Sequence, residues 1–132
     1  MPAGLGNRKH MEISILRKGD LQILGVKGKI RLQNWRVLDK HLETMLDNGS
    51  RWVAMDLSDV SLICSTGIGA IMHNIRKFQD QDSSLMVIAT KPYMQDLFQM
   101  FGCEPLLGDN LFSDWRTLEK RLHSQGLAFT AP

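Results

Sequence analysis

The chain has 132 residues, a length that suits one folded domain with a single core and is too short for two. Its formal net charge of +2 is too small to argue for nucleic-acid binding, and its basic residues are spread along the chain without interleaved aromatics. No apolar run approaches the ~20 residues needed to span a bilayer. We therefore expect a folded cytoplasmic domain without membrane insertion.

The chain is predicted to open with a β-hairpin. Residues 1–10 are Gly-rich and basic and lack the apolar segment of a secretory signal, so they are predicted to form a flexible arm. Met11–Leu16 and Leu21–Val26 alternate between apolar and other residues with period two, and turn residues lie between them. This pattern predicts two antiparallel strands.

A helix is predicted after the hairpin. The segment Gly28–Arg31 leads into it, and Asn34 is available near its start as a cap. The turn signal Asp47–Ser50 ends it. Its apolar stripe is predicted to contain Leu32, Trp35, Leu38, Leu42, Met45 and Leu46.

The middle of the chain is predicted to pass from a strand into a second helix. Trp52–Ser58 is apolar and partly β-branched, which is typical of a short strand, and Asp59–Ile63 is predicted as a loop. The helix is predicted to begin near Ser65, whose hydroxyl is a good N-cap. Its apolar face is predicted to contain Ile68, Ile71, Met72, Ile75 and Phe78, and its polar face His73, Asn74, Arg76, Lys77 and Gln79.

Two further strand–helix units are predicted to complete the chain. Leu85–Ala89 is a short apolar run typical of a buried strand, and a helix follows from Thr90–Pro92 to Gly102, which fits the C′ position. Leu106–Leu107 and Leu111–Phe112 are predicted as a weak edge strand and turn. Ser113 is predicted to cap the last helix, whose inner face carries Trp115, Leu118 and Leu122, and residues 125–132 are predicted to be a flexible tail.

This order of elements predicts an α/β fold. Strands joined by helices pair in parallel through right-handed crossovers, and the opening hairpin adds one antiparallel strand. Residues 11–124 are therefore predicted to form a single domain with a mostly parallel sheet, an N-terminal antiparallel hairpin and four helices.

The turn before the central helix is the strongest candidate for a functional site. Ser65 and Thr66 stand at the helix start, and Gly67 and Gly69 leave room for another protein to approach. Phosphorylation there would add a charge of roughly −1.5 to −2 and three acceptor oxygens. The alternative is that Ser65 only caps the helix.

The run Asp56–Gly69, DLSDVSLICSTGIG, resembles the central signature of STAS domains, in particular that of bacterial anti-sigma factor antagonists. In that family a D-L-S-x-V run leads to D-S-[ST]-G-[LI]-G at the start of a helix. Cys64 stands where the family usually has Asp. The resemblance covers roughly residues 11–122 and implies a STAS-like fold.

The resemblance also implies a function in signal transduction and transcription regulation. Ser65 would be the residue that a GHKL-type serine kinase, itself the anti-sigma factor, phosphorylates, with Thr66 the less favoured acceptor. The unphosphorylated chain would bind that partner, and phosphorylation would release it. The residues implied in binding are Lys29, Arg31, Asn34, Cys64, Ser65, Thr66, Gly67 and Ile68.

Two other function classes are weighed against this one. The first is a STAS adaptor without a switch, either in a signalling assembly or on the cytoplasmic face of a membrane transporter, and the basic residues Lys29 and Arg31 together with Cys64 favour it. The second is an enzyme, which is disfavoured because no catalytic, metal or cofactor site emerges from the residues. Cys64 and Cys103 are expected to be reduced thiols. The oligomeric state stays open between a monomer and a weak dimer.

Overall fold

The computed structural model describes residues 11–101 and 109–127. Within these residues the elements follow the predicted order of strands and helices. They are β1 (Met11–Lys18), β2 (Leu21–Ile30), α2 (Trp35–Asp47), β3 (Trp52–Ile63), α3 (Ser65–Asp80), β4 (Ser84–Ile88), α4 (Pro92–Met100), β5 (Leu111–Phe112) and α6 (Trp115–Ser124). The helix predicted to start with a proline does so, since Pro92 is its first residue.

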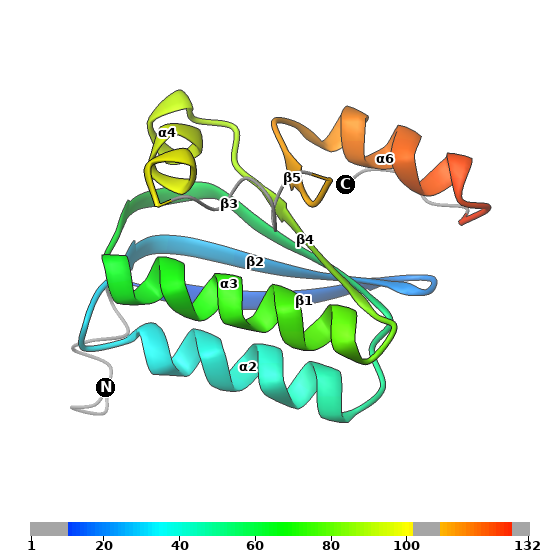
Figure 1. Cartoon of the computed structure of the whole chain (residues 1–132), viewed down its shortest axis with the longest axis horizontal. Coiled ribbons are helices and arrows are strands. Elements are labelled where there is room, and N and C mark those ends of the chain that lie inside the picture. The colour runs from blue at the N-terminus through cyan, green and yellow to red at the C-terminus, as the bar shows by residue number, and fades with distance from the viewer. Residues whose placement is uncertain (1–10, 102–108, 128–132) are drawn as a thin grey trace.

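The strands form one sheet in the order β1-β2-β3-β4-β5. Strand β1 pairs with β2 in antiparallel orientation, and the other neighbours pair in parallel. Helices α2 and α3 lie side by side along the sheet, while α6 lies beside β5 at the other edge (Figure 1). The predicted fold, a mostly parallel sheet with an N-terminal hairpin, is therefore confirmed.

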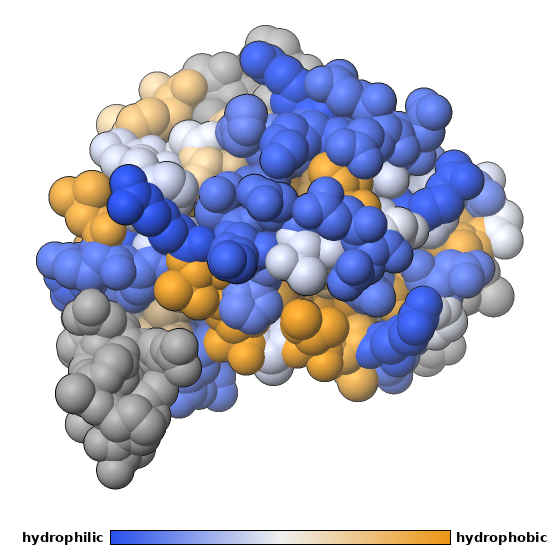
Figure 2. Space-filling view, turned by 90° about the horizontal axis from the view of Figure 1, so that it is seen from below, coloured by the Kyte–Doolittle hydropathy of each residue, from blue (hydrophilic) through white to orange (hydrophobic). Residues whose placement is uncertain are grey.

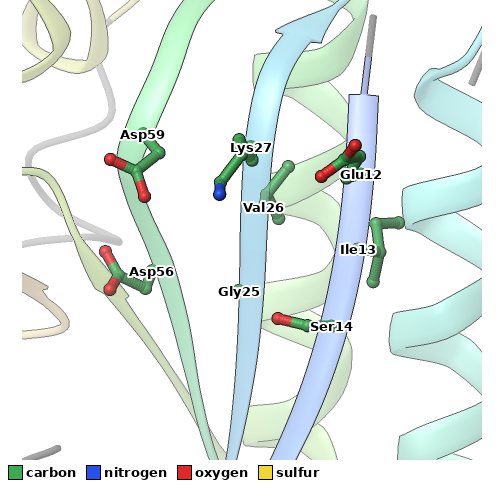
Figure 3. Close-up of a pocket in the computed structure, with 8 residues that line it drawn as sticks. All are labelled: Glu12, Ile13, Ser14, Gly25, Val26, Lys27, Asp56 and Asp59. Atoms are coloured by element: carbon green, nitrogen blue, oxygen red, sulfur yellow. The ribbon is translucent and has the colours of Figure 1, made fainter. Parts of the chain in front are cut away.

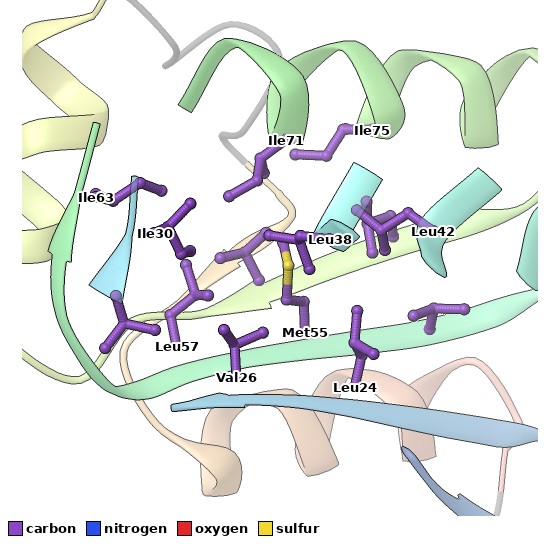
Figure 4. Close-up of a cluster of buried hydrophobic side chains, with 14 of the residues drawn as sticks. Leu24, Val26, Ile30, Leu38, Leu42, Met55, Leu57, Ile63, Ile71 and Ile75 are labelled. Carbon is purple, nitrogen blue, oxygen red and sulfur yellow. The ribbon is translucent and has the colours of Figure 1, made fainter. Parts of the chain in front are cut away.

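Two apolar clusters pack against the sheet. The larger one lies between the sheet and helices α2, α3 and α4, and Figure 4 shows its central part around Leu38, Met55 and Ile71. The smaller one joins α6 to the opposite side of the sheet through Leu118 and Leu122, with Leu21, Ile23, Ala54, Met86, Ile88 and Phe112. Helices on both faces explain why β4 is apolar almost throughout.

Strands β2 and β3 run further than predicted. The loop expected at Asp59–Ile63 is the second half of β3, and β2 continues to Ile30. Their pairing shifts register between Gly25 and Lys27 and again between Gly28 and Lys29, so that β3 contributes two extra residues. The three buried residues Leu57, Val60 and Ile63 therefore reach the larger cluster at a spacing of three, which hides the strand from a search for period two.

Three residues at or along the helices differ from the prediction. Leu32 lies outside α2 and its side chain is 69% exposed, so it does not belong to the apolar stripe. Asn74, predicted on the polar face of α3, is buried, and its Nδ2 donates to Asp39 Oδ1 at 2.7 Å and to the carbonyl of Ala70 at 2.8 Å. The bond to Asp39 joins α3 to α2. Asp114, rather than Ser113, caps α6.

The predicted elements at Gly102 and Leu106–Leu107 lie outside the described residues. Residues 125–127, predicted as the start of the tail, form a turn in which the N–H of Leu127 donates to the carbonyl of Leu122 at 2.9 Å. The side chain of Leu127 packs against the smaller cluster. No helix in the described part of the chain is long and apolar enough to cross a membrane.

Candidate functional site

The turn that joins β3 to α3 lies at the carboxyl end of the parallel strands. The N–H of Cys64 donates to the carbonyl of Ile30 at 2.9 Å, which ties this turn to the end of β2. Ser65 and Thr66 follow as the first two residues of α3, and both are exposed. The predicted phosphoacceptor therefore lies on the surface, on a turn held at a fixed position on the sheet.

The cap of α3 is Cys64 and not Ser65. The Sγ of Cys64 accepts a hydrogen bond from the N–H of Gly67 at 3.3 Å, and its carbonyl accepts from the N–H of Ile68 at 3.1 Å. Cys64 has extended backbone angles, as an N-cap residue does, and Ser65 is already helical. The prediction that Ser65 caps the helix is wrong, so the Ser65 hydroxyl is not needed to begin α3.

Gly67 allows α3 to approach the sheet closely. A Cβ at this position would lie 2.9 Å from Ile30 Cγ2 and 3.2 Å from Ile63 Cγ1. Gly67 and its neighbour Ile68 are buried. Figure 4 shows Ile30 and Ile63 near the start of α3. Of the predicted binding residues, Gly67 and Ile68 therefore support the turn from beneath and present no side chain to a partner.

The loop between β2 and α2 is held from inside by Asn34. Its Oδ1 accepts from the N–H of Arg31 at 2.7 Å, and its Nδ2 donates to the carbonyl of Lys29 at 3.0 Å. Asn34 is 2% exposed and makes no side-chain bond to the first turn of α2, although it occupies the N-cap position. Of the predicted binding residues, Lys29 and Arg31 are half-buried, whereas Asn34 only positions them.

Three side chains near this end of the sheet were not among the predicted site residues. Leu32, on the loop after β2, is strongly exposed, and Leu62, near the end of β3, is 37% exposed. Lys91, before α4, donates from Nζ to the carbonyl of Val60 at 3.3 Å. The apolar character of Leu32 and Leu62 favoured burial, so the sequence carried no signal of their exposure.

A hollow of about 200 Å³ lies over β1, β2 and β3. Figure 3 shows Glu12, Lys27, Asp56 and Asp59 around it, with the Ser14 hydroxyl directed toward Gly25. The Asp56 carboxylate is already engaged, because it accepts from the N–H and hydroxyl of Ser58 and from Trp115 Nε1.

The carboxylates of the hollow do not make a metal site. Across the described ranges, no group of three or more His, Cys, Asp or Glu side chains is placed to hold a metal ion. The Asp56 carboxylate joins β3 to α6, because it accepts a hydrogen bond from Trp115 Nε1 at 3.1 Å.

A family model described as "Mlab, STAS domain" matches residues 13–108 of the chain. No curated protein sequence matches this chain. The turn that carries Ser65 lies within the matched region.

Solved structures share the fold at low sequence identity. The anti-sigma factor antagonist from Mycobacterium paratuberculosis has a TM-score of 0.76 at 14% identity, over 86% of this chain and 94% of that one. The phosphorylated form of the Bacillus cell fate determinant SpoIIAA has a TM-score of 0.62 at 13% identity, over 85% of this chain and 98% of that one. The sulfate transporter family protein from Wolinella succinogenes has a TM-score of 0.65 at 16% identity, over 83% of this chain and 92% of that one.

Proposed function

Because this chain belongs to the STAS-domain family, we propose that it is a bacterial anti-sigma factor antagonist whose binding is switched at Ser65. In its unphosphorylated form it binds an anti-sigma factor that is also a GHKL-type serine kinase. That kinase phosphorylates Ser65, with Thr66 as the weaker acceptor, and the complex then dissociates. The chain acts in the cytoplasm as a binding protein and not as an enzyme.

The observation that carries this proposal is the exposure of Ser65 on an anchored turn. A kinase has to reach the hydroxyl, and the main chain around that hydroxyl has to be held in place. Ser65 is exposed, and the hydrogen bond from Cys64 to Ile30 anchors the turn. The hydroxyl is also not required as the helix cap, since Cys64 serves that purpose. Modification of Ser65 therefore leaves the start of α3 in place, and its effect falls on the partner.

The charges around Ser65 suggest how phosphate ends binding. The hydrogen bond between Cys64 and Ile30 brings the start of α3 beside Lys29, near the end of β2, and Arg31, on the loop that follows. These two basic residues favour a partner with an acidic surface. A phosphate of roughly −1.5 to −2 at Ser65 would offset the two basic charges and would have to be desolvated on docking.

The same phosphate is compatible with the folded chain. Ser65 is the first residue of α3, and a negative charge there interacts favourably with the unpaired N–H groups and the dipole of the helix. The switch therefore needs no unfolding of the domain. It acts through the charge and hydration of the surface around Ser65.

The proposal is tested with Ser65 variants and a candidate kinase. Ser65→Asp is expected to abolish binding, and Ser65→Ala is expected to bind the kinase permanently. Thr66→Ala is the matched control, because Thr66 is also exposed and is adjacent to Ser65. Labelling with ATP should mark the wild type and Thr66→Ala but not Ser65→Ala. Undiminished binding by Ser65→Asp, or undiminished labelling of Ser65→Ala, would refute the switch.

A second candidate function is a STAS adaptor without a switch, in a signalling assembly or on the cytoplasmic face of a transporter. The observation that favours it is Cys64, which caps α3 with a thiol where the family usually has a carboxylate beside the phosphoacceptor. A partner that binds wild type and Ser65→Asp with equal affinity, and no labelling at Ser65, would support this function over the first.

A further inference from the structure

Strand β1 is the outermost strand of the sheet and carries exposed apolar side chains at its centre. Ile15 is 52% exposed and Leu16 is 47% exposed. Figure 2, which looks onto the side of β1 and α2, shows apolar side chains gathered among polar ones. Soluble proteins usually protect such an edge with charges or proline in its middle, because it can pair with another strand. The charged residues of β1 lie instead toward its two ends, at Glu12, Arg17 and Lys18.

The hairpin turn determines which backbone groups of β1 face outward. Gly19 and Asp20 form a two-residue turn in which Gly19 has a φ of +62°, and Lys18 pairs with Leu21. In such a hairpin the residues that flank the turn exchange hydrogen bonds, and bonded and non-bonded pairs alternate along the strands. The outward N–H and C=O groups of β1 therefore belong to Ile13, Ile15 and Arg17.

We propose that β1 pairs with β1 of a second copy of this chain, antiparallel and centred on Ile15. Cross-strand partners lie on the same face of a sheet, and this register places Glu12 opposite Lys18 of the partner subunit, twice by symmetry. Parallel pairing in register would set Glu12 against the partner's Glu12. Shifting the antiparallel register by two residues removes the Glu12–Lys18 pairs. Charge complementarity therefore selects one orientation and one register.

The same register also covers the exposed apolar side chains. Ile15 lies against the partner's Ile15 on the face that carries α2, where it already borders a groove with His41, Thr44 and Met45. Leu16 lies on the other face, opposite the partner's Ser14 and diagonal to the partner's Leu16. The contact is two-fold symmetric, and each copy contributes the open edge of its β1. The pairing therefore closes as a dimer and does not grow into a fibre. It does not rest on Ser65 or on the proposed switch.

Sedimentation velocity of the full chain over a range of concentrations tests the proposal. The wild type is expected to change from monomer to dimer with concentration. Ile15→Lys sets two lysines against each other at the symmetry axis and should move the midpoint at least about tenfold higher. Met100→Lys is the control, because Met100 is 78% exposed on α4, away from β1, and should leave the midpoint unchanged. Circular dichroism verifies that each variant is folded.

A charge exchange tests the register. Glu12→Lys alone should weaken the dimer, because it sets two lysines opposite each other, and the double variant Glu12→Lys/Lys18→Glu should restore it. A wild type that stays monomeric at millimolar concentration would overturn the proposal. A dimer that Ile15→Lys leaves intact, or that the double variant does not restore, would overturn it equally.

Discussion

Replacing Gly67 by alanine tests whether the turn at Ser65 depends on close contact between α3 and the sheet. A Cβ at Gly67 would lie 2.9 Å from Ile30 Cγ2 and 3.2 Å from Ile63 Cγ1, whereas one at Gly69 meets nothing within 4 Å. In a helix, Gly→Ala stabilises by about 0.5–1 kcal/mol, and overpacking a core costs about 1–3 kcal/mol. Gly69→Ala should therefore be more stable than the wild type, and Gly67→Ala less stable.

The two variants together isolate the steric cost. Both gain a similar helix preference, so their unfolding free energies should differ by the overpacking cost, about 1–3 kcal/mol. At about 4 °C per kcal/mol for a domain of this size, the thermal midpoints should differ by about 4–12 °C. Urea unfolding followed by circular dichroism gives the free energies directly.

A third variant checks that Ile30 causes the effect. Leucine has no Cγ2, so Ile30→Leu removes the nearest atom while it keeps the volume of the side chain. The double variant Gly67→Ala/Ile30→Leu should lose less unfolding free energy than the two single variants lose in sum. If Gly67→Ala proves as stable as Gly69→Ala, the close contact between α3 and β2 is not the reason for this glycine, and the reasoning is wrong.

Three further predictions concern single side chains. Asn74→Ala should lower the unfolding free energy in urea by about 1–3 kcal/mol, because it removes the buried donor to Asp39; an unchanged midpoint would contradict this. Cys64→Asp should raise stability by about 0.5–1 kcal/mol, because a carboxylate caps a helix better than a thiol, and a lower melting temperature would refute it. The N–H and hydroxyl of Thr117 hold the pKa of Asp114 below its ordinary value of 3.8. The ionised Asp114 carboxylate therefore stabilises the folded chain above about pH 4, and this stabilisation is lost as the pH falls. Between about pH 5 and pH 3 the melting temperature of Asp114→Asn should therefore fall less than that of the wild type.

The order of the elements was predictable because each apolar run was short and ended at a clear turn. The hairpin, the buried strand β4 and the proline that opens α4 each follow from local rules. These signals depend only on neighbours in the sequence. They do not depend on which distant residues come together.

The wrong predictions concern features that depend on contacts between residues far apart in the sequence or on the backbone angles at the site. The end of β3 looked like a loop because its pairing with β2 shifts register twice. Asn74 looked like a surface residue because its partner, Asp39, lies 35 residues away on α2. At the site, the motif located Ser65 correctly on the surface, but the cap fell to Cys64, since extended backbone angles at Cys64 make Ser65 the first helical residue.

The two register shifts in β3 set a limit on changes in the length of this segment. A substitution at the exposed residues Asp59 or Leu62 alters only the side chain concerned, whereas Val60 between them is buried in the larger cluster. Deletion of one residue there would remove one of the two extra residues that separate Leu57, Val60 and Ile63 by three positions. Because each such irregularity bends the strand and increases its twist, losing one would change the direction in which β3 leads into the turn at Ser65. We therefore expect functional variants of this domain to vary in composition here and to keep the same number of residues.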